Sequence, residues 1–180
     1  MKNVNPTLNL HTQKLATIWS PEFFHKNKVK YASGDYIFNC LFTVSCYATN
    51  RKIERGQQEF ARQVCQNIIE RMDAIIGKIN KMKQGLEEQS GDSLVRNFEP
   101  ENEFVLPYDA SRLGRENTKL LKVFMTYNQY FLTLNRLRYD EEITIDYATN
   151  QRNNAYNLLL TCLGDLNVMC IEYHKIRKAQ

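Results

Sequence analysis

The stretch KIERGQQEFARQVCQNIIERMDAIIGKINKMKQGLEE, residues 52–88, decides the fold class. Its apolar residues recur at steps of three, four or seven positions: Ile53, Phe60, Val64, Ile68, Met72, Ile75, Ile79, Met82 and Leu86. This spacing places them along one face of an α-helix, and the polar face carries glutamates, arginines and lysines. The stretch therefore predicts one long amphipathic helix whose mixed charged face contacts solvent.

Two more long helices are predicted further along the chain, after one extended connection. They cover residues 110–138 and 145–175, and apolar residues recur in both at helical spacing. Asp109 or Ser111 is expected to start the first helix, and Thr144 is expected to cap the second.

The predicted fold is mainly α, an antiparallel helical bundle with long helices and a short N-terminal β-strand. Because only a short turn joins the last two helices, they should pack antiparallel, and the 52–88 helix can cover the apolar face that they share. An aromatic-rich helix at residues 35–50, with Asp35 as its cap, is expected to precede the three long helices.

The N-terminal segment follows a different pattern. Residues 7–11, TLNLH, alternate polar and apolar side chains with period two, which predicts a half-buried strand. A second short strand is expected at residues 103–106. Thr12 is placed to cap a short helix after the first strand, and Ser20-Pro21 is typical of the start of another.

The chain length suits one domain with a substantial core rather than two. Within it we distinguish residues 1–33, a basic element with a strand and short helices, from the helical bundle of residues 34–180. We expect the two parts to form one compact unit.

Positive charge is concentrated at the N-terminus. The first 30 residues contain five lysines and a single acidic residue, Glu22, whereas the rest of the chain holds 19 basic and 19 acidic side chains. The whole formal charge of +4 therefore belongs to this segment. Such asymmetry favours an anionic partner, most often nucleic acid, although a solubilising terminal arm would have the same composition.

Several protein classes are disfavoured by the sequence. No apolar run is long enough to cross a bilayer, and the N-terminus lacks the charged-then-apolar order of a secretory signal. The five cysteines form no CxxC pair, which argues against a disulfide framework or a zinc site. Motifs of hydrolases, metalloproteases, nucleotide-binding loops and dinucleotide-binding folds are missing. We therefore expect a cytoplasmic, non-enzymatic protein without a cofactor or a membrane partner.

One short motif resembles a metal site. Glu22 and His25 form a Glu-x-x-His sequence, but a di-iron bundle needs two such motifs and two further glutamates on facing helices. We therefore predict no metal site.

Two stretches carry a resemblance to a known family. LNLHTQKLATIW, residues 8–19, resembles the entry of a family encoded on integrating conjugative elements, which is similar to the AcaB-type transcriptional activators of conjugative plasmids. LPYDASRLGRENTKLL, residues 106–121, resembles the Pro-Tyr and leucine-pair helix of that family. Two positions depart from the pattern: Ala16 lies one place late, and Ile18 replaces a leucine.

The resemblance implies a DNA-binding transcription regulator of a mobile element that functions as a homodimer. In a ribbon–helix–helix-like element, the N-terminal strands of two chains would pair and enter the major groove. Leu8 and Leu10 would face the apolar layer beneath the strand, and Thr7, Asn9 and His11 would face outwards. The implied DNA-binding residues are Thr7, Asn9 and His11 for bases, with Lys14, Lys26, Lys28 and Lys30, together with Lys2, for phosphates.

Two alternatives remain open at this point. The strand can instead pair with residues 104–106 of its own chain at the edge of the helices, which would remove the intermolecular ribbon. The chain can also be a helical adaptor of a conjugation or secretion apparatus that binds another regulatory or conjugation protein through an aromatic-rich groove.

Overall fold

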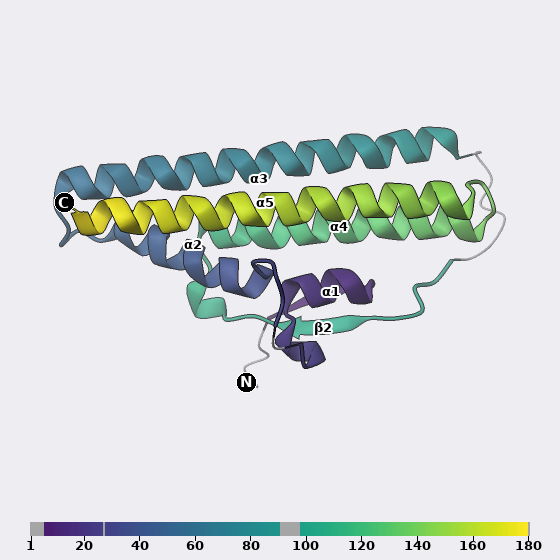
Figure 1. Cartoon of the computed structure of the whole chain (residues 1–180), viewed down its shortest axis with the longest axis horizontal. Helices are drawn as coiled ribbons and strands as arrows, with labels where there is room; N and C mark the ends of the chain where they lie inside the picture. Colours follow the sequence, from purple (N-terminus) through teal and green to yellow (C-terminus); the bar gives the residue numbers. More distant parts are fainter. Residues whose placement is uncertain (1–5, 27, 91–97, 180) are drawn as a thin grey trace.

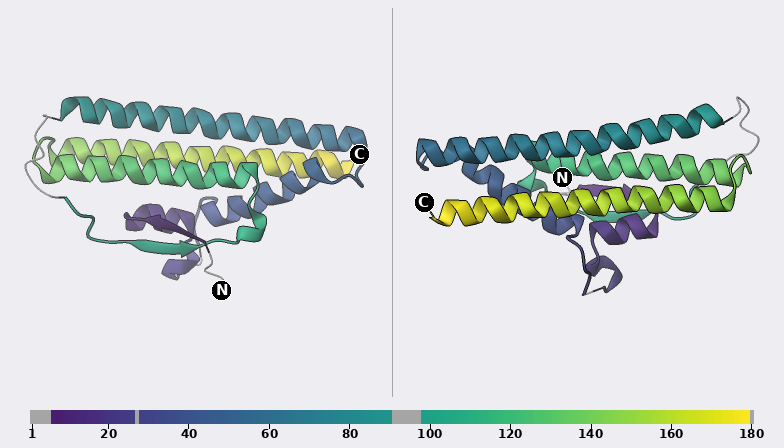
Figure 2. Two further views of the ribbon diagram at one scale, coloured as in Figure 1. Left: turned by 180° about the vertical axis from the view of Figure 1, so that it is seen from behind. Right: turned by 45° about the horizontal axis from the view of Figure 1, so that its top comes forward.

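The computed structural model describes residues 6–26, 28–90 and 98–179, and this part of the chain is mainly helical, as predicted (Figure 1). Three long helices lie side by side: α3 (Arg55–Gln89), α4 (Arg115–Tyr139) and α5 (Ile145–Ala179). Helices α3 and α4 run in the same direction and α5 runs in the opposite direction (Figures 1 and 2). The N-terminal segment packs on the side of α4 and α5 that faces away from α3 (Figure 2).

Helix α3 forms because its apolar stripe is buried along most of its length. Ile68, Met72 and Ile79 have essentially no exposed surface, whereas the glutamates and most lysines of this helix are exposed. The predicted amphipathic helix is therefore confirmed. It begins at Arg55 rather than at Lys52, because the preceding residues form a turn and the backbone of Glu54 is not helical.

The start of α4 differs from the prediction. Residues 110–112 form a separate 3₁₀ helix, η2 (Ala110–Arg112), in which the Asp109 side chain accepts a hydrogen bond from the Ser111 N–H at 2.9 Å. Extended backbone at Leu113 and Gly114 separates η2 from α4. Asp109 therefore caps the short turn and not the long helix.

The start of α5 agrees with the prediction. The Thr144 hydroxyl accepts a hydrogen bond from the Tyr147 N–H at 3.2 Å, which is the geometry of an N-terminal cap. The helix continues beyond the predicted end at Lys175, to Ala179.

The N-terminal segment contains strand β1 (Thr7–Leu10), helix α1 (Gln13–Trp19) and the 3₁₀ helix η1 (Glu22–Phe24). The short helix predicted from Ser20-Pro21 is thus only one 3₁₀ turn, which ends at His25 in a left-handed conformation, φ 55°. This turn is too short to act as the second helix of a ribbon–helix–helix element.

Helix α2 (Gly34–Thr49) connects the N-terminal segment to the long helices. Ser33 occupies its N-cap position, and Asp35, the predicted cap, lies in the first turn. The Trp19 ring packs edge-on against Phe124 of α4 and Phe38 of α2, with centroid separations of 5.0 and 6.0 Å. The N-terminal segment therefore shares one apolar core with the helices.

A second aromatic cluster lies where α3 begins and α5 ends. Phe60 stacks on Tyr173 with 5.5 Å between ring centroids, and Tyr47 lies 6.0 Å from the same ring. His174 packs beside Tyr173, and the Arg177 guanidinium lies 4.4 Å from the centroid of Tyr47. These contacts fix the end of α5 against α2 and α3.

We predict that Gly34→Ala destabilises the protein. A Cβ atom at this position would lie 2.5 Å from Cε3 of Trp19 and 2.8 Å from Cζ of Phe124, both in the packed core. Overpacking of this kind costs about 1–3 kcal/mol of unfolding free energy. Gly77→Ala is the matched control, because its Cβ would meet nothing within 4 Å, and it should stabilise α3 by up to about 1 kcal/mol. Urea unfolding measures both variants, and equal effects would contradict the prediction.

We also predict that the stability of the protein depends on pH through His174, and that His174→Gln makes this pH dependence weaker. Burial, followed by the charges of Arg177 and Lys178, lowers the pKa of His174 from its ordinary value of 6.5. The unfolded chain then binds the proton more readily than the folded chain, so this contribution to stability is complete above pH 6.5 and is lost as the pH falls towards the folded pKa.

Urea unfolding of the wild type and His174→Gln at several pH values between neutral and mildly acidic tests this effect. Because His174 is only half-buried, the difference in slope should be small. Identical slopes in the two proteins would exclude the proposed role of this histidine.

Candidate nucleic-acid interface

The strand β1 pairs antiparallel with β2 (Phe104–Pro107) of the same chain, with Leu8 opposite Leu106 and Asn9 opposite Val105. This arrangement is the intramolecular alternative considered above. The two strands form a short ribbon that lies on the outside of the molecule, beside α1 (Figure 1). No third strand flanks the ribbon within the described ranges.

The two faces of the ribbon differ as the alternation predicts. Leu8, Leu10 and Leu106 are buried against the helices. The outward face carries exposed side chains of both strands: Thr7, Asn9, Val105 and Pro107. The predicted orientation of Leu8 and Leu10 inwards, and of Thr7 and Asn9 outwards, is therefore confirmed.

The polar groups on the outward face bond to each other. The Thr7 hydroxyl donates to Oδ1 of Asn9 at 3.0 Å, and Nδ2 of Asn9 donates to Oε1 of Glu103 at 2.9 Å. Glu103, Glu101 and Glu99 are exposed in the segment that leads into β2. A ligand of the Asn9 amide therefore competes with the Glu103 carboxylate, and one end of the ribbon is acidic.

His11 does not share the outward face with Thr7 and Asn9. Its backbone N–H donates to Oδ1 of Asn128 at 2.9 Å, and its ring Nδ1 lies 3.0 Å from Nδ2 of the same residue. The Asn128 side chain therefore contacts both the backbone and the ring of His11. The predicted outward orientation of His11 is wrong, because the buried Asn128 of α4 holds the end of β1 inwards.

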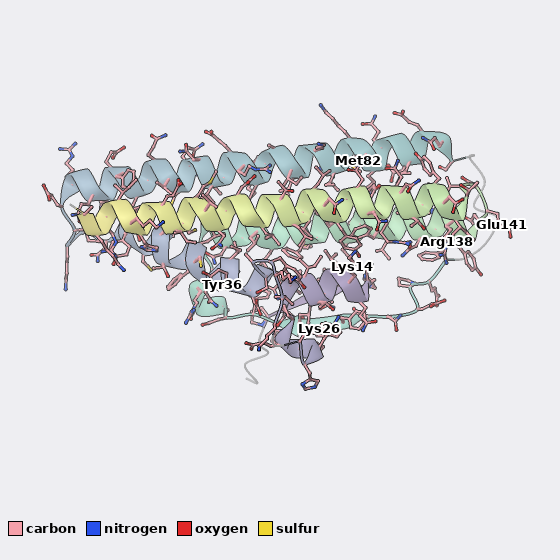
Figure 3. All side chains as sticks on the ribbon, in the orientation of Figure 1. Lys14, Lys26, Tyr36, Met82, Arg138 and Glu141 are labelled. Atoms are coloured by element: carbon pink, nitrogen blue, oxygen red, sulfur yellow. The ribbon has the colours of Figure 1, made fainter. Side chains whose placement is uncertain are left out.

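The predicted phosphate-binding lysines lie in two places. Lys14, on α1, has its Nζ 4.3 Å from the ring centroid of Tyr156 on α5. Lys26, Lys28 and Lys30 are exposed in the connection between η1 and α2, and none forms an ion pair with another residue of the described ranges. Lys14 and Lys26 extend from different parts of the N-terminal segment (Figure 3). Lys2 lies outside the described residues.

The connection that carries these three lysines lies next to the ribbon. The ring of Phe24, in η1, packs on the ring of Phe104, in β2, with centroids 5.5 Å apart. This contact joins the turn before the lysines to the strand that pairs with β1. Phe104 shares the inward face of β2 with Leu106, so the contact places the lysine connection next to the ribbon, whereas Thr7 and Asn9 lie on the opposite, outward face.

Sequence analysis did not predict a polar groove on another side of the molecule. The groove lies between the end of α2, the beginning of α3 and the start of α4, and arginines contribute to its lining. The sequence predicts that the arginines of α3 lie on a solvated helix face, because periodicity cannot show which polar residues of separate helices meet.

Comparisons with protein-family models, with curated proteins and with solved structures find no match to this chain. The family resemblance of the two sequence stretches therefore stays a prediction. In the described residues, no helix combines the length and the apolar character needed to cross a membrane.

We predict that Asn128→Leu loosens the end of β1. Leucine has a similar volume but cannot accept from the His11 N–H, so a partly buried donor would lose its partner, at a cost of about 1–3 kcal/mol of unfolding free energy. The control is Asn9→Ala, which removes only exposed hydrogen bonds and should change stability by less than about 0.5 kcal/mol. Urea unfolding compares them, and an Asn128→Leu variant as stable as the wild type would refute this anchoring role.

Proposed function

We propose that the chain is a non-enzymatic DNA-binding regulator that contacts the major groove with the β1–β2 ribbon. The observation that carries this proposal is the position of three exposed lysines, without ion-pair partners in the described ranges, next to a two-stranded ribbon whose outward face is polar. The major groove of B-DNA admits a two-stranded β-ribbon, and ribbons of this kind read bases in known regulators. In this proposal one chain supplies both strands.

The proposed contacts divide into base contacts and phosphate contacts. Thr7 and Asn9 would face base edges, and the Asn9 amide would exchange the Glu103 carboxylate for adenine. Lys26, Lys28 and Lys30 would bind phosphates and supply affinity without sequence information. The acidic residues before β2 would be repelled by the DNA backbone, so the lysine side of the ribbon is the side that approaches phosphates.

The sequence resemblance supports a more specific form of this proposal. The chain would regulate transcription on a conjugative or integrative mobile element, and two copies would bind the two half-sites of an operator. Pairing of β1 with β2 does not supply the dimer contact, so another surface would have to do so.

A second candidate function is that of a protein adaptor. An apolar pocket of about 320 Å³ lies on α2 and the turn after it, lined by Phe42, Cys46, Tyr47 and Ile53 among others. Aromatic side chains in a shallow apolar pocket are typical anchors for a partner protein. This function would require no DNA affinity above the non-specific level.

Two substitutions separate base contacts from phosphate contacts. On a duplex site selected in vitro from random DNA, Asn9→Ala should weaken binding by about 1–3 kcal/mol and should hardly change binding to random DNA. Lys28→Ala should weaken both about equally and reduce the salt slope by about one unit. The control is Lys78→Ala, which removes the same charge from the exposed face of α3.

Fluorescence anisotropy at several salt concentrations gives these affinities. If selection yields no preferred site, or if Lys28→Ala binds like Lys78→Ala, the DNA-binding proposal is wrong and the adaptor function is favoured.

A further inference from the structure

The polar groove described above carries an excess of positive charge. It has a volume of about 1130 Å³ and includes side chains of Arg51, Arg55, Arg62 and Arg115. Two carboxylates, Glu59 and Glu116, also line it. Guanidinium groups bind phosphate through paired, charge-assisted hydrogen bonds, so this composition indicates an anionic ligand.

Two of the four arginines are already held by neighbours. Arg62 pairs with Glu59 at 3.4 Å and donates to the backbone carbonyl of Ala48 at 3.3 Å. Arg115 donates to Oε1 of Gln66 at 3.4 Å. Arg51 and Arg55 form no ion pair with any residue in the described ranges. The end of the groove at Arg51 and Arg55 therefore has uncompensated positive charge.

The other end of the groove contains a buried carboxylate. Glu116 is only 6% exposed and lines the groove beside the Cys65 thiol. Burial, together with the negative charge of Glu116 and its hydrogen bond, raises the pKa of Cys65 to about 12, so this thiol stays protonated. A carboxylate accepts hydrogen bonds, and a ligand that reaches it must bring N–H or O–H donors rather than a phosphate.

The two ends are far enough apart to require an extended ligand. One end lies at Arg115, which contacts Gln66 of α3, and the other lies at Arg55, the first residue of α3. The rise along the helix from Arg55 to Gln66 makes the distance between the two ends about 16 Å. One phosphate or one carboxylate cannot span this length. A ligand that fits has anionic groups at one end and a hydrogen-bond donor at the other.

We propose that this groove binds a nucleoside polyphosphate. The phosphates would lie at Arg51 and Arg55, with Arg62 between the two ends. The base would lie at Glu116 and Arg115, where a guanine offers N–H donors to the carboxylate and acceptors to the guanidinium. This site lies apart from the ribbon and does not rest on the DNA-binding proposal.

Calorimetric titration with GTP and with inorganic pyrophosphate tests the proposal. The wild type should bind GTP more tightly than pyrophosphate, because only GTP reaches Glu116. Arg55→Gln should weaken both ligands by about tenfold or more, the usual loss for a charge-assisted hydrogen bond. Glu116→Gln should weaken GTP and leave pyrophosphate binding unchanged.

Two controls make the test specific. Lys78→Gln removes one positive charge from α3 outside the groove and should bind GTP like the wild type. Asn9→Ala, on the ribbon, should also leave GTP affinity unchanged, so failure of this site and failure of the DNA-binding proposal are distinguishable. Circular dichroism of each variant establishes that it is folded.

Three results would overturn the proposal. The first is GTP binding that is undetectable at millimolar concentration or no tighter than pyrophosphate binding. The second is an Arg55→Gln variant that binds GTP as well as Lys78→Gln does. The third is an Arg55→Gln variant that loses DNA affinity while its GTP affinity is unchanged, which would show that the arginines bind a nucleic-acid backbone.

Discussion

The close packing of Trp19 against Gly34 and Phe124 is the constraint on which the rest of the structure depends. The indole is almost completely buried, and it lies where any side chain at position 34 would have to be. Helix α2 can therefore approach α1 and α4 closely only because residue 34 is glycine. This contact fixes the N-terminal segment on the long helices, and through it the position of the β1–β2 ribbon.

The ribbon has a defined orientation because both of its ends are attached to the helices. Leu8, Leu10 and Leu106 are buried beneath it, and Asn128 of α4 holds the end of β1 through the His11 N–H. Only the opposite face remains available for a ligand. The same anchoring that presents Thr7 and Asn9 outwards removes His11 from that face, so the surface that we propose for DNA is smaller than the alternation of the sequence suggests.

Positive charge is used differently at the two surfaces discussed above. The lysines between η1 and α2 are exposed and have long side chains, which suits contacts with a phosphate backbone in water. The arginines of the groove lie on separate elements and converge on one cavity, with Arg62 already fixed by Ala48 and Glu59. Planar groups held in this way suit an extended ligand of defined shape.

The sequence by itself determined the mainly helical class, the approximate extents of the long helices, the Thr144 cap and the inward orientation of Leu8 and Leu10. Each of these follows from local periodicity, because the geometry of a helix or a strand fixes which neighbouring residues share a face. Tertiary structure alone decided that β1 pairs with β2, that His11 bonds to Asn128 and that arginines of α3 and α4 line one groove. These features depend on contacts between residues far apart in the chain, and the period of a single segment carries no information about its partner.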